Sequence, residues 1–419
     1  MSVTSAMYTG ISGLAANGEA MSVIGNNISN VNTTGFKSGR MLFSDVLSST
    51  ISGGSQIGRG VQIQAVQNDF SQGSFESTQS STDLAIQGDS FFVVQNSNGR
   101  YYTRAGAFNF DKDKVLVNPD GYQVQGYGII PGTGQSNGVL GAINLTSFAS
   151  TPPKQTANVK MVVNLDSTQT TPALPWDPTN PVATSNFSTS LSVYDSLGNA
   201  HTATAYFRKT AANAWDWHVI IPDATAGTPG SVTTPINGTL AFSSTGALTA
   251  QTPTAGTAQN ITFANGSTVP QPVLFDLGVG ATTQYASASI VSSQTQDGYY
   301  QGTLTKVTID DKGYVNGVYS NGQLQKLYQV ALAKFSSNDG LSKSGGSLFE
   351  ETLASGQPML SNAATPGVGK ILSNSLEQSN VDMAAQFVKM ITTQRGYSAN
   401  SKTITTADEM LQEVLGLKR

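Results

Sequence analysis

The segment 375–419, SLEQSNVDMAAQFVKMITTQRGYSANSKTITTADEMLQEVLGLKR, closes the chain and carries a regular pattern of apolar side chains. Apolar residues recur there every seven positions, with one further residue four positions after the second: Leu376, Met383, Phe387, Met390, Tyr397, Ile404 and Leu411. This spacing predicts a C-terminal helix over residues 372–419 with a single apolar seam. Because the seam is narrow and heptad-like, we expect it to pack against another helix.

The first 33 residues show the same spacing and predict an N-terminal helix. Its seam residues are Met7, Ile11, Leu14, Met21, Ile24 and Ile28. Gly18 and Gly25 fill two further seam positions, and a glycine inside a helix costs about 1 kcal/mol relative to alanine. We therefore expect this helix to form only against a close partner, namely the C-terminal helix of its own chain and of neighbouring subunits. The alternative is that both segments are ordinary amphipathic helices on a globular core.

The composition narrows the classes of function. Only 11% of the 419 residues are charged, so uncharged polar side chains must cover much of the surface. A net charge of −4 without a basic run disfavours binding to nucleic acid or to an anionic membrane. The absence of cysteine excludes disulfides and thiolate sites, and two histidines disfavour a histidine-rich metal site. We therefore expect no cofactor, no metal and no enzyme activity.

The sequence also bears on export. No run of about 18 apolar residues is present that could span a membrane. The N-terminus lacks a basic region followed by a continuous apolar core, so it does not predict a cleavable secretory signal. If the protein leaves the cell, we expect it to keep its N-terminus and to use another route.

Between the two helices the sequence predicts β-structure. Strand-forming residues alternate with polar ones, and tight turns such as Asn98-Gly99 and Lys312-Gly313 separate the predicted strands. The predicted order is an extended connector over 34–73, the first part of an inner β-domain over 74–149, an inserted outer β-domain over 150–293, and the second part of the inner domain over 294–371. The predicted fold class is mainly β with α-helical termini, with one discontinuous β-domain and a second β-domain inserted into it.

Several stretches together resemble the bacterial flagellar hook proteins. They are VIGNNISNVNTTGFKSG, LAIQGDSFFVV, VYDSLGNAH, SNGQLQKLYQVALAKF and SLEQSNVDMAAQFVKMITTQRGYSANSKTI. In the first of them the motif positions are Asn26, Asn27, Gly35, Phe36 and Lys37. The terminal motifs are shared by rod, hook and hook-associated proteins, whereas the inserted domain and the VYDSLGNAH hairpin indicate the hook. The resemblance therefore points to one member of the axial flagellar family.

This resemblance implies a structural subunit that polymerises into a flexible tubular universal joint and transmits torque from rod to filament. It implies as partners other copies of the chain, the rod and hook–filament junction proteins, a hook cap during assembly and the flagellar type III export apparatus. The implied location is the extracellular part of the flagellum, at the hook and basal body. We further expect the terminal helices to be disordered in the free monomer and to order on assembly, because isolated helices are marginal in water.

Two alternatives are kept. One is a distal rod or other axial flagellar subunit. The other is a secreted β-rich adhesin or sugar-binding protein, in which a platform is formed by Trp215, Trp217, Tyr206 and Phe207. In strands such alternating aromatic residues more often form core and cross-strand pairs.

Two motifs that could indicate catalysis are interpreted as structural. Residues 134–138 match the G-x-S-x-G pattern of a nucleophile elbow, but that elbow must lie between a strand and a helix, and no helical pattern follows here. Asp195 and His201 flank the predicted turn of the VYDSLGNAH hairpin, and we interpret them as turn residues.

Overall fold

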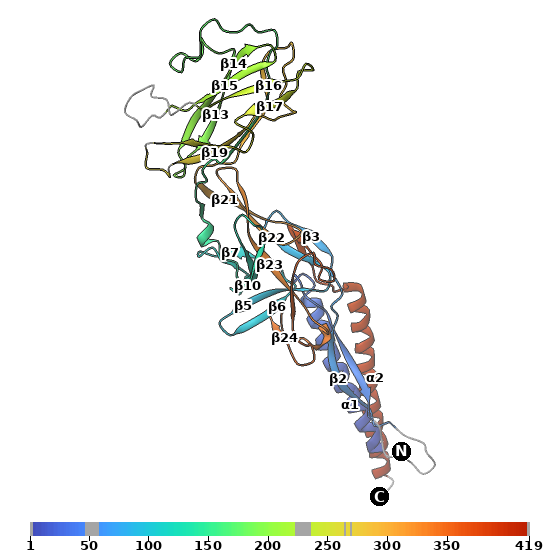
Figure 1. Ribbon diagram of the computed structural model, residues 1–419. Coiled ribbons are helices and arrows are strands. Elements are labelled where there is room, and N and C mark those ends of the chain that lie inside the picture. The colour runs from blue at the N-terminus through green and yellow to red at the C-terminus, as the bar shows by residue number, and fades with distance from the viewer. Residues whose placement is uncertain (1–2, 47–57, 223–235, 264, 269, 417–419) are drawn as a thin grey trace. The chain divides into compact units, whose positions relative to one another are not determined.

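The computed structural model describes residues 3–46, 58–222, 236–263, 265–268 and 270–416 of the chain (Figure 1). The chain divides into two compact units. Unit 1 comprises Met1–Phe148, Lys306–Val318 and Leu324–Arg419, and unit 2 comprises Ala149–Thr305 and Tyr319–Gln323. Unit 2 is thus inserted into a discontinuous unit 1, and both helices longer than three residues in the described residues lie near the chain termini. The predicted fold class is confirmed.

Unit 1 contains the two helices and a large, mostly antiparallel sheet. The helices are α1 (Val3–Ser29) and α2 (Met383–Gly416), and a separate hairpin is formed by β1 (Gly39–Asp45) and β2 (Val61–Asn68). Part of the large sheet follows the order β22 (Tyr314–Tyr319), β23 (Leu324–Lys334), β9 (Gln123–Ile129), β5 (Phe91–Asn96), β6 (Gly99–Thr103), β25 (Leu348–Glu350) and β24 (Ser342–Gly345). Shorter strands complete the unit: β3 (Phe75–Ser77), β4 (Leu84–Gln87), β7 (Asn109–Phe110), β8 (Leu116–Val117), β10 (Ser136–Ala142), β26 (Met359–Asn362), β27 (Lys370–Ser373) and β28 (Ser375–Glu377).

Aromatic rings fill the core of unit 1 between strands that are distant in sequence. Phe91 of β5 makes edge-to-face contacts with Phe335 and Phe349, with ring centroids 5.9 and 5.7 Å apart. Tyr102 of β6 contacts Phe335 in the same way at 4.8 Å. Such pairs contribute beyond their burial alone. They join strands from the first and last thirds of the chain in one core.

Unit 2 packs two sheets around one core. A five-stranded antiparallel sheet contains β13 (Phe187–Tyr194), β14 (Ala200–Ala211), β15 (Ala214–Ile220), β16 (Ile236–Phe242) and β17 (Leu248–Thr252). A second sheet has the order β18 (Ala258–Ile261), β19 (Gln271–Asp276), β12 (Asn158–Asn164) and β20 (Ile290–Gln296). The short β11 (Ser150–Thr151) pairs with the start of β21 (Gly302–Ile309). Apolar residues of both sheets, among them Trp215, Trp217 and Phe275, form one buried cluster.

The boundaries differ from the sequence-based ones in three places. The predicted insertion over 150–293 is shorter than unit 2, because the strand pair β11–β21 and the bond from the Ser320 amide to the Thr303 carbonyl extend that unit. The predicted connector over 34–73 contains the β1–β2 hairpin, and its residues 47–57 lie outside the described residues. The predicted C-terminal helix over 372–419 begins only at Met383, since residues before it form β27 and β28.

Candidate assembly surface

The two helices pack against each other along one face and run antiparallel (Figure 1). A side-chain carbon added at Gly10 would lie 2.9 Å from Ile404, and one added at Gly13 would lie 2.7 Å from the Asn400 amide. Farther along, Asn27 Nδ2 donates to Gln386 Oε1 at 3.4 Å. Residue numbers rise along α1 as they fall along α2. Glycine thus allows close backbone approach at the end of the pair that contains the chain's N-terminus.

The face of α1 that packs on α2 is not the predicted seam. Apart from Ile24, the buried α1 residues are small or polar, and all six repeat every three or four positions: Gly10, Gly13, Ala16, Ala20, Ile24 and Asn27. Of the predicted seam only Ile24 is buried; Met7, Leu14, Met21 and Ile28 are half-buried, and Ile11 is exposed. Gly18 and Gly25 have open space around the position of a side chain. Close helix packing depends on small side chains, so glycine and alanine at helical spacing were the signal for this face. Packing of the predicted seam against neighbouring subunits stays a prediction.

On α2 the predicted positions divide into three groups. Met383, Met390, Ile404 and Leu411 are half-buried, and of these Ile404 reaches Gly10 of α1. Tyr397 and Phe387 are exposed. Leu376 is not in the helix: it lies in β28, paired with Glu76 of β3. The reason is local, because the Asp382 carboxylate accepts bonds from the amides of Ala384 and Ala385 and so caps the helix at that point.

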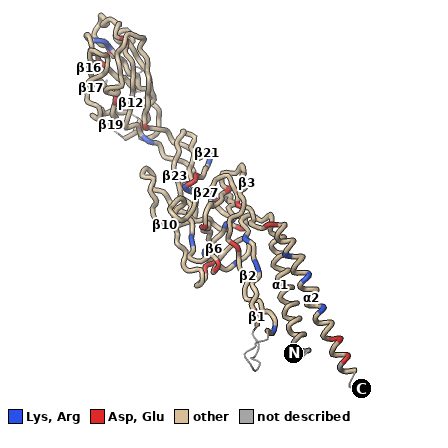
Figure 2. Tube along the Cα trace, turned by 90° about the vertical axis from the view of Figure 1, so that its right-hand side faces the viewer, with Lys and Arg blue, Asp and Glu red and all other residues tan. Residues whose placement is uncertain are grey.

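Apolar side chains remain exposed on the side of α2 that faces away from α1. Phe387, Val388 and Ile391 are 47%, 62% and 50% exposed. The helical period places them opposite Gln386 and Asn400, which meet α1. Figure 2 shows α2 dotted with charged residues and α1 nearly free of them, and Glu19 is the single charged residue of α1. The pair therefore presents an apolar strip that nothing within the described residues of the chain covers.

The β1–β2 hairpin adds a second apolar area beside the helices. It packs on α1, where the Val61 amide donates to Ser12 Oγ at 3.3 Å. Phe43 pairs across the hairpin with Ile63, and both side chains are exposed, as is Val66. A two-stranded ribbon is marginally stable alone, so this hairpin depends on α1 and on whatever covers its outer face.

The motif residues that the resemblance singled out join α1 to the β-structure. Asn27 is buried, with its amide donating to the Gly39 carbonyl at 2.7 Å and accepting from the Gly39 amide at 2.9 Å. Gly35 has φ +68°, and a side-chain carbon there would lie 2.4 Å from the Ala105 nitrogen. Only glycine suits both requirements. Asn26 is exposed, and its backbone carbonyl accepts the amide of Asn30 at the end of α1.

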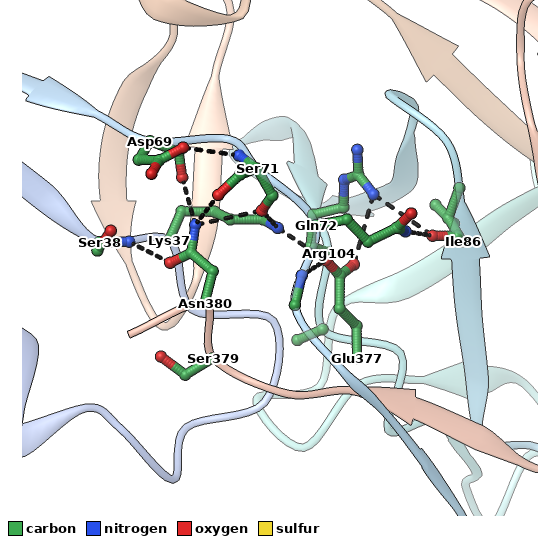
Figure 3. A network of polar contacts seen from close by, with 12 residues as sticks. Lys37, Ser38, Asp69, Ser71, Gln72, Ile86, Arg104, Glu377, Ser379 and Asn380 are labelled. Carbon is green, nitrogen blue, oxygen red and sulfur yellow. Dashed lines mark hydrogen bonds and ion pairs between the residues drawn. The ribbon is translucent and has the colours of Figure 1, made fainter. Parts of the chain in front are cut away.

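Lys37 belongs to a buried charge cluster (Figure 3). Its Nζ lies 2.7 Å from Glu377 Oε1 and donates to the Ser71 carbonyl at 2.6 Å, while Arg104 lies 3.4 Å from Glu377 Oε2. All three side chains are almost wholly buried. Burial lowers the pKa of Lys37 and of Arg104, and the Glu377 carboxylate opposes this shift in both. The Gly73 amide also donates to Glu377 Oε1 at 3.0 Å, so one carboxylate holds four chain segments together.

The motifs that could indicate catalysis or sugar binding lie in a strand, in a hairpin turn and in the core of unit 2. Ser136 of the G-x-S-x-G stretch begins strand β10, so the stretch leads into a strand and not into a helix. Asp195 accepts the amides of Leu197 and Asn199 and bonds to His201 Nε2 at 3.1 Å, which organises the hairpin turn. Burial acts to raise the pKa of Asp195, but these and other hydrogen bonds outweigh it and hold the pKa well below its usual range. Trp215 and Trp217 are buried in the core of unit 2 and cannot contact a sugar.

Among the residues that the structure describes, no group of three or more His, Cys, Asp or Glu side chains is placed to hold a metal ion. No helix in the part of the chain that the structure describes is long and apolar enough to cross a membrane.

Four family models match successive parts of the chain. They are the flagella basal body rod protein at residues 7–37, the flagellar hook protein FlgE/F/G D1 domain at 85–160, the flagellar basal body protein FlaE D2 domain at 164–299 and the flagellar basal body rod FlgEFG protein C-terminal at 372–417. The D1 model ends at residue 160 and the D2 model begins at residue 164, so both limits lie in the first part of unit 2, which begins at Ala149.

Full-length relatives agree with this domain order. The flagellar hook protein FlgE of Borreliella burgdorferi is 36% identical, with 98% of this chain and 99% of that protein covered. FlgE of Escherichia coli is 36% identical, with 97% of this chain and 98% of that protein covered. The crystal structure of Helicobacter pylori flagellar hook protein FlgE2 superposes with a TM-score of 0.52 at 16% identity, covering 72% of this chain and 100% of that one, which shows likeness of fold.

Proposed function

Because the chain belongs to the family of bacterial flagellar hook proteins and is a structural subunit of the flagellar hook, we propose that α1, α2 and the β1–β2 hairpin form the surface on which neighbouring subunits pack. Polymerisation through this surface builds the tube that joins rod to filament. The predicted seam residues of α1 then face other subunits more than they face α2 of their own chain.

The observation that carries this proposal is the exposed apolar strip of α2. Phe387, Val388 and Ile391 lie together on a helix face that α1 does not cover. Contiguous exposed apolar residues of this kind mark protein–protein contacts. Met7, Leu14 and Met21 of α1 are half-buried beside two glycines with open space, which leaves room for a neighbouring helix. Two different faces that complement each other give a head-to-tail contact, and a contact that does not close into a ring gives a helical filament.

We also propose partners at the ends of the polymer. We assign to this chain contacts with the rod and hook–filament junction proteins, with a hook cap during growth and with the flagellar export apparatus. We propose that the chain keeps α1 on export, because α1 packs on α2 in unit 1 and belongs to the surface that builds the tube.

The assembly surface is tested by Phe387→Asp. The charge cannot be buried against a neighbour, and the lost burial of one large side chain is worth about 1.5–3 kcal/mol. We expect the critical concentration for polymerisation to rise at least tenfold, measured by sedimentation and by negative-stain electron microscopy of the purified protein. Phe387 is exposed in the subunit, so the unfolding temperature of the β-structure of units 1 and 2 (the β-units) should not change.

The matched control is Val182→Asp, which places the same charge at an exposed apolar position of unit 2, outside the proposed surface. It should assemble like the parent chain. Normal assembly of Phe387→Asp would contradict the proposed surface.

A further inference from the structure

A fully exposed leucine projects from unit 1. Leu353 lies in the 352–356 turn, just after β25, and its relative exposure of 106% is the highest of any large apolar side chain in the described residues. An exposed leucine alone needs no explanation. The turn that carries Leu353, however, is fixed by several hydrogen bonds.

Hydrogen bonds fix the 352–356 turn on both sides of Leu353. Thr352 Oγ1 donates to the Gly340 carbonyl at 2.6 Å and accepts the amides of Ala354 and Ser355 at 3.1 and 3.3 Å. Ser355 is wholly buried, and its Oγ donates to the Thr352 carbonyl at 2.9 Å. A side-chain carbon at Gly340 would lie 2.4 Å from the Ala354 carbonyl carbon, so the turn rests directly on backbone. Leu353 is therefore held outward on a rigid support.

Unit 1 also contains a cavity of about 480 Å³ that no other part of the function uses. One wall is the motif turn, with Thr34, Gly35 and Phe36, and another is the tip of the β24–β25 hairpin, residues 345–347. Gly345, Gly346 and Ser347 all have positive φ, and nothing lies within 4 Å of a side-chain carbon added at Gly345. The cavity is thus bordered by backbone at its hairpin wall, which admits a bulky side chain.

The cavity suits an apolar group better than a charged ligand. Phe36, Pro119, Leu348 and Phe349 contribute to its lining. Its Lys343 is already engaged, since Nζ donates to the Lys37 carbonyl at 3.0 Å and lies 5.1 Å from the centre of the Phe36 ring. Burial lowers the pKa of Lys343, which fits a cation turned toward the protein and away from a ligand.

The turn and the cavity lie at opposite ends of the β24–β25 hairpin. The cavity adjoins the hairpin tip at 345–347, and the 352–356 turn is anchored to Gly340 beside the hairpin base. A single copy therefore carries the projection and the recess on one rigid element, displaced along the strands. A contact between two different patches is head-to-tail, and it builds a filament where the rotation between copies does not close into a ring. Asn26 and Asn30 of the α1 end also border the cavity, so it is continuous with the proposed assembly surface.

We propose that Leu353 of one subunit inserts into the Phe36–Gly346 cavity of the next subunit in the hook. This inference rests on the proposed function, because it needs a polymer of this chain. In this contact Phe36 of the motif, which is half-buried in the subunit, forms one wall of the cavity that receives Leu353. The contact also joins the β-structure of neighbouring subunits, in addition to the contact made by the helices.

Cysteine pairs test the contact directly, because the chain has no cysteine of its own. A disulfide forms only where the two Cβ atoms approach to about 3.5–4.5 Å. We expect assembled Leu353→Cys/Thr34→Cys protein to give a ladder of cross-linked oligomers on mild oxidation, seen on a non-reducing gel. Leu353→Cys alone, and the matched pair Leu324→Cys/Thr34→Cys with another exposed leucine of unit 1, should give none.

A second variant keeps the test independent of cross-linking. Leu353→Asp changes a side chain that touches solvent only, so the unfolding temperature should stay unchanged while the critical concentration for polymerisation rises about tenfold. Leu324→Asp should assemble as the parent does. Polymers seen by electron microscopy without a ladder, or normal assembly of Leu353→Asp, would overturn the Leu353 contact and leave the proposed function intact. Failure of the parent chain to polymerise would overturn both.

Discussion

At the scale of single residues, Glu377 links segments at the joint between the helices and the β-structure. Its carboxylate meets Lys37 from the motif turn, Arg104 after β6 and the Gly73 amide. The cluster carries two cations for one carboxylate in a buried place. Such a cluster adds little net stability over apolar packing, but removing one partner leaves a buried charge uncompensated. Its role is to fix geometry between segments far apart in sequence.

Glu377→Gln should therefore be severely destabilising. The substitution keeps the shape of the side chain but leaves Lys37 and Arg104 without a counter-charge, which costs about 3–5 kcal/mol. Denaturant unfolding of the full chain measures this loss. Asp276→Asn is the control, because it removes a partly exposed pair with Lys160 at 3.6 Å and should cost less than about 1 kcal/mol. Equal effects of the two substitutions would contradict the role assigned to Glu377.

His218 makes the stability of unit 2 depend on pH. Its ring stacks on Trp176 at 3.9 Å, and neither ring nitrogen has a hydrogen-bond partner in the described residues. Burial, aided by the Arg208 guanidinium, lowers the pKa of His218 from 6.5 to about 4. Between these values the unfolded chain binds more protons than the folded one, so stability falls as pH falls through this window and changes no further below it.

We expect a loss of up to about 3 kcal/mol between pH 6.5 and pH 4 from this histidine. The three tryptophans of the chain, Trp176, Trp215 and Trp217, all lie in unit 2, so their fluorescence reports its unfolding. His218→Phe keeps a ring that can stack on Trp176 but has no group that titrates. Between pH 6.5 and pH 4 its unfolding free energy should therefore fall less than that of the parent chain, by the loss given above. Identical pH profiles for the two proteins would refute the assignment.

At the scale of elements, the pairing of α1 with α2 depends on where glycine occurs. Gly10 and Gly13 let the backbones approach, whereas Gly18 and Gly25 meet nothing in the subunit. Amide side chains of Asn17, Asn27, Gln386 and Asn400 line the same contact. Polar side chains buried between two helices fix how the helices align along each other, but they stabilise the contact less than apolar side chains would. The helix pair is therefore well specified but weakly held.

Two alanine substitutions separate these roles. Gly18→Ala should stabilise α1 by about 1 kcal/mol, because it improves helix propensity and adds no contact. Gly10→Ala should gain nothing or lose, since the new carbon would lie 2.9 Å from Ile404. Because α1 is only weakly held in the unassembled subunit, amide hydrogen exchange along α1 on the millisecond timescale measures both. Equal protection in the two variants would show that glycine at position 10 is not needed for close approach.

At the scale of the whole molecule, the helices and the β-units differ in what stabilises them. The β-units have continuous cores, such as the cluster around Phe91 and Phe349. The helix pair buries mostly small side chains and leaves most of its larger apolar residues half-buried or exposed. Too little apolar area is then removed from water to offset the entropy of ordering 27 and 34 residues.

In dilute solution we therefore expect amides of α1 and α2 to exchange rapidly, while those of β5, β9 and β23 stay protected. In the polymer both sets should be protected, since neighbours cover the strip around Phe387. Hydrogen exchange followed by mass spectrometry, on the same protein before and after assembly, makes the comparison. Full protection of both helices in the isolated subunit would rule out folding on assembly.

The sequence alone determined the fold class, the two terminal helices, the β-meander turns and the family. These follow from local signals: heptad spacing, Asn-Gly and Lys-Gly turns, and the VIGNNISNVNTTGFKSG motif. The start of α2 could also have been found, since Asp382 is a helix-capping residue directly before the apolar run. The pattern put Leu376 in the C-terminal helix because it lies seven positions before Met383. That spacing fits the helical period even where the helix has not yet begun.

Only the tertiary structure decided which helix face packs inside the subunit and where the buried charges meet. Lys37, Arg104 and Glu377 are separated by up to 340 residues, and no local pattern relates them. Helical spacing shows that a stripe is apolar, but it does not say whether the stripe packs within the chain or against a neighbour. That depends on how closely two backbones can approach, which Gly10 and Gly13 determine only once α2 is folded beside them.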